Sequence, residues 1–314
     1  MRPAISVIFL TTLIGVGQGV FVALYLSELG AALGAWAMPS GSYFALGCAL
    51  SLAFLGAGLL ASFFHLGRPE RAWRSAAMWR TSWLSREVIV LPMFMAVVAA
   101  VGLAHSLRAG GSLTLALGAA GLALALLLFV CTGMIYACLP FLQEWHTPLT
   151  VINYTLLGCA SGFLLCTAWA AAQAPALVVA SAMCTAVLTL AAFLTRAASL
   201  ARNARIRLKS TPQTAIGIKH PRILQKSQGS MGGSFNTREF FHDRSFACLR
   251  AVKLAFLLLV FPLPLALLAA GAPLSSWQLL ASAFVLQYLG LLAERWFFFA
   301  QARHPQNLYY QAIS

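Results

Sequence analysis

Residues 113–139 have the sequence LTLALGAAGLALALLLFVCTGMIYACL, and this stretch decides the fold class. It holds no charged side chain, and a helix of this length spans about 40 Å at 1.5 Å per residue. The hydrocarbon core of a bilayer is about 30 Å thick, so the stretch is long enough to cross it. A strand of a membrane β-barrel would instead alternate apolar and polar residues. The stretch therefore predicts a transmembrane helix.

Seven further apolar runs lie along the 314-residue chain. We place the eight predicted spans at residues 5–26, 43–64, 88–107, 113–139, 151–172, 177–194, 252–270 and 279–299. Hydrophobic residues make up 61% of the chain and charged residues 9%, with a mean hydropathy of +0.83, which excludes a water-soluble enzyme built on one core. The prediction is an all-α polytopic integral membrane protein. Six helices fall within residues 1–194, a long basic extramembrane loop within 195–251, two helices within 252–299 and a tail within 300–314.

The positive charge gathers on one side of this predicted topology. The chain carries 21 Lys and Arg against 7 Asp and Glu, a net charge of +14. Arg2, the loop after the second span, the 195–251 loop and Arg303 share one side, while the other side holds little more than Arg108. Basic residues near short loops stay in the cytoplasm, so we expect both termini there and no role in nucleic-acid binding. The 195–251 loop is expected to contact anionic lipid headgroups or a partner subunit, and the sequence favours neither.

The segment between the second and third spans holds the candidate functional residues. It begins with His65-Leu66-Gly67-Arg68-Pro69 and ends with Ser82-Trp83-Leu84-Ser85-Arg86-Glu87. Because His65 ends one span and Glu87 begins the next, a helical hairpin places both at similar depth at one membrane face. Hydrocarbon disfavours a charged carboxylate, whereas a nearby Arg68 or Arg86 favours it. These opposing effects would leave Glu87 able to gain and lose a proton.

Such a pair suits a lipid-soluble hydroquinone, whose oxidation releases two electrons and two protons. His65 would accept a hydrogen bond from one hydroxyl, and Glu87 would take a proton as general base. Trp73, Trp79 and Trp83 are candidates to enclose the ring. The competing interpretation is interfacial anchoring, since Trp and Arg gather at headgroup depth and Glu87 would complement the dipole of its helix.

Polar residues elsewhere in the predicted spans need partners. An unpaired charge at the centre of a membrane helix raises the free energy of insertion by about 2.5–3.5 kcal/mol. Glu294 and Arg295 would each carry this cost if they had no partner. Neighbouring residues point about 100° apart on a helix, so we expect partners such as Gln18, Tyr136 or Glu144 rather than a simple pair between the two. Gln18, Glu144, Glu294 and Arg295 would then form a structural network or a proton path. Gln18 alone favours an interhelical hydrogen bond.

Several of these pieces together resemble one family. They are His65-Leu-Gly-x-Pro, Arg71-Ala-Trp, Ser82-Trp-Leu-Ser-Arg-Glu87, Gln18, Glu144-Trp145-His146-Thr147-Pro148, Glu294-Arg295-Trp296 and Arg303-His304-Pro305. The joint pattern is similar to the membrane-anchor subunit of dimethyl sulfoxide reductase, the DmsC family, over most of the chain and its eight spans. The 195–251 loop is long and basic for this family, so the final substrate of the complex stays open.

The resemblance implies a multi-pass anchor in the bacterial cytoplasmic (inner) membrane that takes part in anaerobic respiration. Such an anchor binds and oxidises menaquinol as a diffusible substrate and passes the electrons to a four-cluster iron–sulfur subunit, which feeds a molybdopterin catalytic subunit. The family's quinol-site histidine and glutamate fall on His65 and Glu87, with Arg68, Trp83 and Arg86 beside them.

The histidine and cysteine spacing bears on cofactors. A membrane b-type haem usually takes two axial histidines at matching depth, but His105 follows Glu87 by 18 residues, about 27 Å of helix, and so lies at the face opposite His65. The other four histidines fall in predicted loops or the tail, and no two cysteines have the spacing of a C-x-x-C pair. We expect no haem, iron–sulfur cluster, molybdopterin or other metal in this chain.

Two other functions stay open at this stage. A secondary transporter would also have many apolar helices and buried charges, but such folds commonly show internal repeats, and the 65–87 segment has no counterpart around residues 210–240. A passive structural anchor without its own quinol site is the second alternative.

Overall fold

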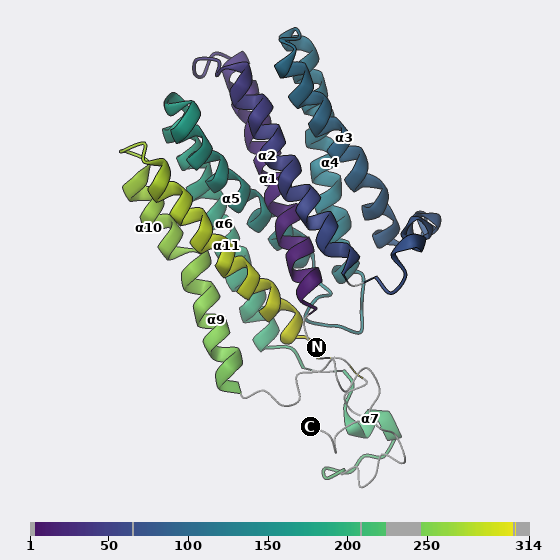
Figure 1. Ribbon diagram of the computed structural model, residues 1–314. Coiled ribbons are helices and arrows are strands. Elements are labelled where there is room, and N and C mark those ends of the chain that lie inside the picture. Colours follow the sequence, from purple (N-terminus) through teal and green to yellow (C-terminus); the bar gives the residue numbers. More distant parts are fainter. Residues whose placement is uncertain (1–3, 65, 208, 224–245, 304, 306–314) are drawn as a thin grey trace.

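The computed structural model describes residues 4–64, 66–207, 209–223, 246–303 and 305 (Figure 1). Every regular element within them is helical, and eight spans are long and apolar enough to cross a membrane, which confirms the all-α membrane fold. The spans are α1 (Ile5–Ala32), α2 (Gly41–Phe63), α3 (Trp83–Ser106), α4 (Gly111–Ala137), α5 (Pro148–Gln173), α6 (Val178–Ala204), the pair α9 (Phe246–Val260) and α10 (Pro262–Gly271), and α11 (Trp277–Ala300). The shorter elements are η1 (Pro69–Met78), η2 (Pro175–Leu177) and α7 (Pro212–Ile216).

Serine caps fix where three of the spans begin. Ser40, Ser82 and Ser276 each accept a hydrogen bond at their side-chain oxygen from a backbone N–H in the first turn of α2, α3 and α11. The first N–H groups of a helix have no partner within it, so such a cap stabilises the helix by about 1 kcal/mol. The cap at Ser82 starts α3 five residues earlier than predicted. Glu87 therefore lies inside the helix rather than at its boundary.

A proline divides the seventh span into α9 and α10. Pro262 has no backbone N–H and its ring collides with the preceding turn, so α9 ends at Val260 and α10 starts after Phe261. The two pieces together, residues 247–271, still form one candidate span of 25 residues.

Helix α6 continues to Ala204, ten residues beyond its predicted end at residue 194. The predicted 195–251 loop is therefore wrong over its first ten residues. Arg196 and Ser199, which would be expected to leave a membrane helix, are buried and bonded to polar groups of neighbouring helices. Residues 224–245, in the second half of the predicted loop, lie outside the described residues.

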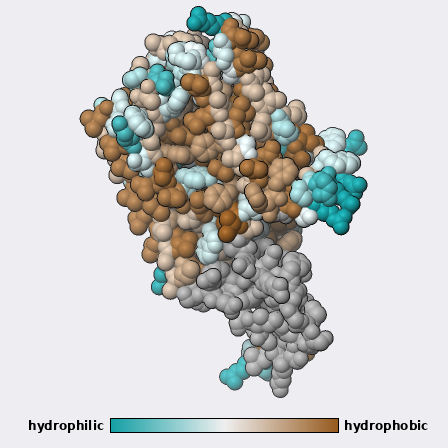
Figure 2. Space-filling model, in the orientation of Figure 1, coloured by the Kyte–Doolittle hydropathy of each residue, from teal (hydrophilic) through white to brown (hydrophobic). Residues whose placement is uncertain are grey.

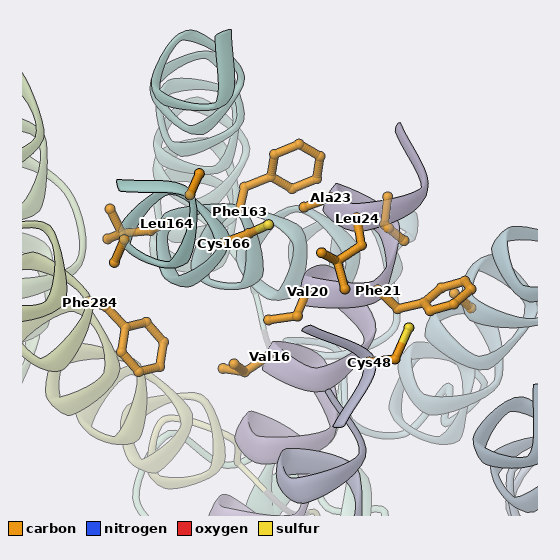
Figure 3. Packing of buried hydrophobic residues seen from close by; sticks show 14 of the residues in the cluster. Val16, Val20, Phe21, Ala23, Leu24, Cys48, Phe163, Leu164, Cys166 and Phe284 are labelled. Carbon is orange, nitrogen blue, oxygen red and sulfur yellow. The ribbon is translucent and has the colours of Figure 1, made fainter. Parts of the chain in front are cut away.

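Helices α1 and α5 cross at the centre of the bundle. Their backbones approach so closely that a Cβ atom added at Gly162 would lie 2.2 Å from the backbone of Gly19. Small residues allow this contact between membrane helices, whose association depends on close packing. Figure 3 shows the apolar core around it: Val16, Val20 and Phe21 of α1 pack among side chains from α2, α5 and α11.

The two ends of the bundle differ in character. One end carries η1, the start of α1, α3 and α5 and the last turns of α2, α4, α6 and α11; we call it the η1 end (Figure 1). In the same view, Figure 2 shows a largely hydrophobic surface over the bundle and a hydrophilic patch at its right edge, where η1 lies. Hydrocarbon solvates such an apolar surface, so the bundle is exposed to lipid and η1 lies at a membrane–water boundary.

Candidate functional site

Glu87 is buried between α3 and α4 at the η1 end. Only 8% of its surface is exposed, and one of its carboxylate oxygens accepts a hydrogen bond from the Thr132 hydroxyl on α4. A carboxylate that only complemented the dipole of its own helix would be solvated at the first turn. Glu87 instead points into the bundle and is held by a neighbouring helix.

The partner predicted for Glu87, His65, lies outside the described residues. The residue before it, Phe64, ends the α2 region at the η1 end and is 80% exposed. The approach of His65 to Glu87 stays a prediction.

Arg86 fastens η1 to α3. Its guanidinium donates hydrogen bonds to the carbonyl oxygens of Trp79 (2.9 Å) and Arg80 (2.8 Å) and lies 4.2 Å from the centre of the Trp83 ring. These contacts direct Arg86 toward the loop before α3, and the described ion pairs join neither Arg86 nor the exposed Arg68 to Glu87. The expected favourable effect of these arginines on the charge of Glu87 is therefore not supported by a contact.

The three tryptophans predicted to enclose the quinol ring differ in their exposure. Trp73 and Trp79 are exposed on and just after η1, by 71% and 52%, and each lies within 5.5 Å of a neighbouring guanidinium. Trp83 is half-buried beneath Arg86. Trp73 and Trp79 therefore have the exposure expected of side chains at a membrane or protein interface.

An apolar groove opens between α1 and α2 at the same end of the bundle. Its volume is about 700 Å³. The lining residues are Ile5, Ser6, Phe9, Leu13, Ala57, Leu60, Ala61 and Phe64. The groove ends at Phe64, next in the chain to His65. A groove with this lining, open to the lipid side, fits a hydrocarbon chain.

A buried cluster of ions joins α6 and α11. Glu294 contacts Arg196 Nε through Oε1 at 2.7 Å and Arg295 Nη1 through Oε2 at 3.1 Å. The expectation that Glu294 and Arg295 would not pair with each other is wrong. Both side chains are long enough to bend toward each other across the 100° that separates them, and the Arg295 guanidinium also lies 3.6 Å from the centre of the Tyr154 ring.

Glu144 faces this cluster across a small cavity. The cavity is lined by Glu144, Thr150, Asn153, Tyr154, Arg196, Ser199, Asn203, Glu294, Arg295, Phe298 and Gln301. The space open to the centre of a water molecule is about 10 Å³, close to what one water needs. Among the described residues, Glu144 Oε2, the Tyr154 hydroxyl and Arg196 Nη2 have no hydrogen-bond partner. Three of the four predicted polar residues, Glu144, Glu294 and Arg295, are thus brought together.

The fourth, Gln18, lies elsewhere and joins two helices. Its side-chain amide donates to the carbonyl oxygen of Ala125 on α4 at 2.9 Å. This confirms the interhelical hydrogen bond expected for Gln18 and removes it as a partner of Glu294 or Arg295.

Sequence reasoning missed a second buried carboxylate at the opposite end. Glu28 of α1 accepts a hydrogen bond from Thr114 of α4 and lies 3.3 Å from His105 Nε2 of α3. His105 stacks on Phe44 with ring centres 4.5 Å apart. Arg196 and Tyr154 were missed as well. A charged residue just beyond a predicted span is the signal that was available for both Glu28 and Arg196.

In the part of the chain that the structure describes, eight apolar helices long enough to span a membrane form an all-helical bundle, which is the architecture of a polytopic membrane protein. Residues 1–301 match the family described as DMSO reductase anchor subunit (DmsC), and the chain belongs to this family. It is also 53% identical over 325 aligned positions, covering 100% of both chains, to a sulfite dehydrogenase subunit of Allochromatium vinosum. The chain is therefore a membrane anchor subunit of an oxidoreductase complex.

Proposed function

We propose that this chain is the quinone-reactive anchor of a molybdopterin oxidoreductase in the bacterial inner membrane. In this proposal a menaquinol or menaquinone ring binds at the η1 end beside Glu87, and two electrons pass between it and an iron–sulfur partner subunit. The observation that carries the proposal is the buried Glu87, held by Thr132, at the end of the bundle where the lipid-open groove lies.

Oxidation of a quinol requires two proton acceptors at the ring and an apolar site for its isoprenoid chain. Oxidation of the quinol gives quinone, two electrons and two protons. Glu87 takes one proton as general base, and His65 accepts the hydrogen bond of the other hydroxyl and then its proton. The groove along α1 and α2 accommodates the isoprenoid chain. Reduction of the quinone uses the same groups in reverse.

The direction of electron flow has two candidates. The resemblance to dimethyl sulfoxide reductase anchors favours oxidation of menaquinol. The relative from A. vinosum is named as part of a sulfite dehydrogenase, a complex that removes electrons from its substrate, and this favours reduction of the quinone. Both directions place the same demand on Glu87, because a proton must be accepted or donated at the ring.

In this proposal the partner subunits dock at the η1 end. We expect a four-cluster iron–sulfur subunit to dock there and a molybdopterin subunit to bind to it, because electrons leaving the ring then need no haem in the anchor. The η1 region presents exposed basic and aromatic side chains, Arg68, Arg71, Trp73, Arg74, Trp79 and Arg80, with Glu70 as its acidic residue. The positive charge of this end supports a cytoplasmic location for it and, as expected from the sequence, for both termini.

The test uses the purified complex with its partner subunits. Glu87→Gln keeps the shape of the side chain and removes the base, so quinone-linked turnover is expected to fall by about 10²- to 10⁴-fold. Activity with an artificial dye that reacts directly with the partner subunits is expected to persist. Glu28→Gln, which changes the buried carboxylate held by Thr114 at the opposite end, is the matched control. A loss below tenfold for Glu87→Gln, with the complex assembled, would leave the chain as a passive anchor. Absence of iron–sulfur absorbance in the purified complex would favour a transporter.

A further inference from the structure

We propose that the Glu87 proton is exchanged with water through a lateral relay formed by Tyr136, Tyr154, one water molecule in the small cavity, and Glu144. The relay rests on the proposed quinone site, because it carries the proton that the ring exchanges with Glu87. It assigns a function to the buried cluster between α5, α6 and α11.

The first step runs along one face of α4. Thr132 donates its hydrogen bond to Glu87, and Tyr136 follows Thr132 by four residues, one turn further toward the η1 end. Residues four apart lie on the same face of a helix. The side chain of Tyr136 is therefore the next polar group on the face that holds Glu87.

The second step crosses from α4 to α5. The Tyr136 ring stacks on the Tyr154 ring, with centres 5.5 Å apart and planes at 20°. The Arg295 guanidinium covers the Tyr154 ring at 3.6 Å. This sandwich holds Tyr154 beside Tyr136, so that the two side chains interact, while the buried Tyr154 hydroxyl makes no hydrogen bond of full geometry among the described residues. A buried hydroxyl without a partner costs free energy, which one water molecule would recover.

The third step crosses the cavity. The Tyr154 hydroxyl and Glu144 Oε2 are both buried polar atoms of residues that line it, and both lack a partner in the described part of the chain. The cavity has the volume for one water and supplies the two or more polar partners that a buried water needs. A water held there joins the tyrosine to the carboxylate.

The last step leads out of the bundle. Glu144 belongs to the short connection between α4 and α5, at the η1 end. The side chains of Arg202 and Asn203 on α6 bond to carbonyl oxygens of this connection, those of Gln143, Glu144 and His146. Arg202 is half-buried, so the connection lies at the boundary between the bundle and water.

The ion cluster positions the relay rather than carrying the proton. Glu294 is held between two guanidiniums, and Glu144 lines the same cavity. The titratable and charged groups that line the cavity with Glu144 are Tyr154 of α5, Arg196 of α6, and Glu294 and Arg295 of α11. Arg202 of α6 bonds to the backbone of the loop that carries Glu144. In quinol oxidation the proton leaves Glu87 for water, and the electrons pass to the iron–sulfur partner. In quinone reduction the proton moves from water to Glu87, and the electrons come from that partner.

The experiment compares Tyr154→Phe and Glu144→Gln with Tyr288→Phe in the assembled complex. Tyr288 is a membrane tyrosine that bonds to Thr12 and lies off the relay, so it serves as the matched control. Quinone-linked turnover is divided by dye-linked turnover in each sample, so that only assembled complex is counted. Both relay variants are expected to lower this ratio by about 10²-fold and to alter its pH profile, whereas Tyr288→Phe leaves both unchanged.

Rescue separates proton transfer from a structural role. Formate, a small weak acid that carries protons, is expected to restore at least part of the turnover of Glu144→Gln, and Glu144→Asp is expected to retain it. Failure of formate to act, or ratios within twofold of the wild type in both relay variants while Glu87→Gln is impaired, would overturn the relay and leave the quinone site standing. Unimpaired turnover in Glu87→Gln would overturn the site and the relay together.

Discussion

Thr114 and Thr132 lie on the same face of α4, and each donates a hydrogen bond to a buried glutamate at a different end of the bundle. Eighteen residues make five helical turns, so the two hydroxyls are separated by about 27 Å. Thr114 bonds to Glu28 of α1 and Thr132 to Glu87 of α3. Glu28 also has His105 at 3.3 Å, whereas none of the described ion pairs includes Glu87. Among the described residues, one carboxylate therefore has an imidazole beside it and the other has no ion-pair partner.

Removal of the hydroxyl that holds Glu87 should impair the quinone reaction. Thr132→Val keeps the shape of the side chain and deletes a hydrogen bond to a charged group, worth about 1.5–3 kcal/mol. We expect quinone-linked turnover to fall by about tenfold or more. Thr114→Val makes the same change at the other end and should leave turnover per assembled complex unaltered. Equal effects of the two variants would mean that the hydroxyls act only on stability.

The pair at the opposite end should act on stability alone. His105→Ala removes both the partner of Glu28 and a ring stacked on Phe44. We expect the midpoint of thermal unfolding in detergent to fall, because a buried carboxylate loses its partner at a cost of about 1–3 kcal/mol or more. Quinone-linked turnover, relative to dye-linked turnover, should not change. A selective loss of quinone-linked turnover would assign this end a part in the reaction.

The ion cluster predicts that loss of Glu294 destabilises the protein more than loss of Arg196. Glu294→Leu leaves two guanidiniums buried, whereas Arg196→Met leaves Glu294 still paired with Arg295. Breaking a buried ion pair by removing one partner costs about 3–5 kcal/mol. We expect Glu294→Leu to reduce the yield of folded protein more than Arg196→Met, as measured by size-exclusion chromatography. The reverse order would show that Glu294 gains little from its two partners.

The crossing of α1 and α5 should not tolerate a methyl group. Gly162→Ala places a Cβ 2.2 Å from the backbone of Gly19, and overpacking of this kind costs about 1–3 kcal/mol or more. Gly56→Ala, on α2, meets nothing within 4 Å and should be neutral or slightly stabilising in its helix. Thermal unfolding of the two variants measures the difference. Similar unfolding midpoints would show that α1 and α5 can move apart without loss of stability.

The number of spans could be predicted because it depends only on local sequence. A run of about 20 apolar residues has to be helical in a bilayer, whatever lies around it. The end of α6 could not be predicted in this way. Arg196 resembles the end of a span until its partner Glu294 is known, and that partner lies 98 residues further along the chain. The cap at Ser82 likewise moved the start of α3 ahead of its apolar run.

For the candidate site, the sequence likewise predicts which residues stand out but not how they contact one another. The position of Glu87 at one membrane face follows from helix length, and Glu144, Glu294 and Arg295 stood out as charges in an apolar chain. Their arrangement depends on tertiary contacts that sequence spacing does not encode, such as the threonine of α4 that holds Glu87. Glu28 fell in a predicted loop, and only the longer α1 brings it against His105.

The position of Glu87 within the first two turns of α3 has an electrical consequence. Moving one elementary charge across the membrane against 100 mV costs about 2.3 kcal/mol. If the proton, its exit and the electron partner all share the η1 end, neither protons nor electrons traverse the hydrocarbon during turnover. The reaction at this anchor would then be electroneutral, and its rate in sealed vesicles would be the same whether or not a membrane potential is imposed.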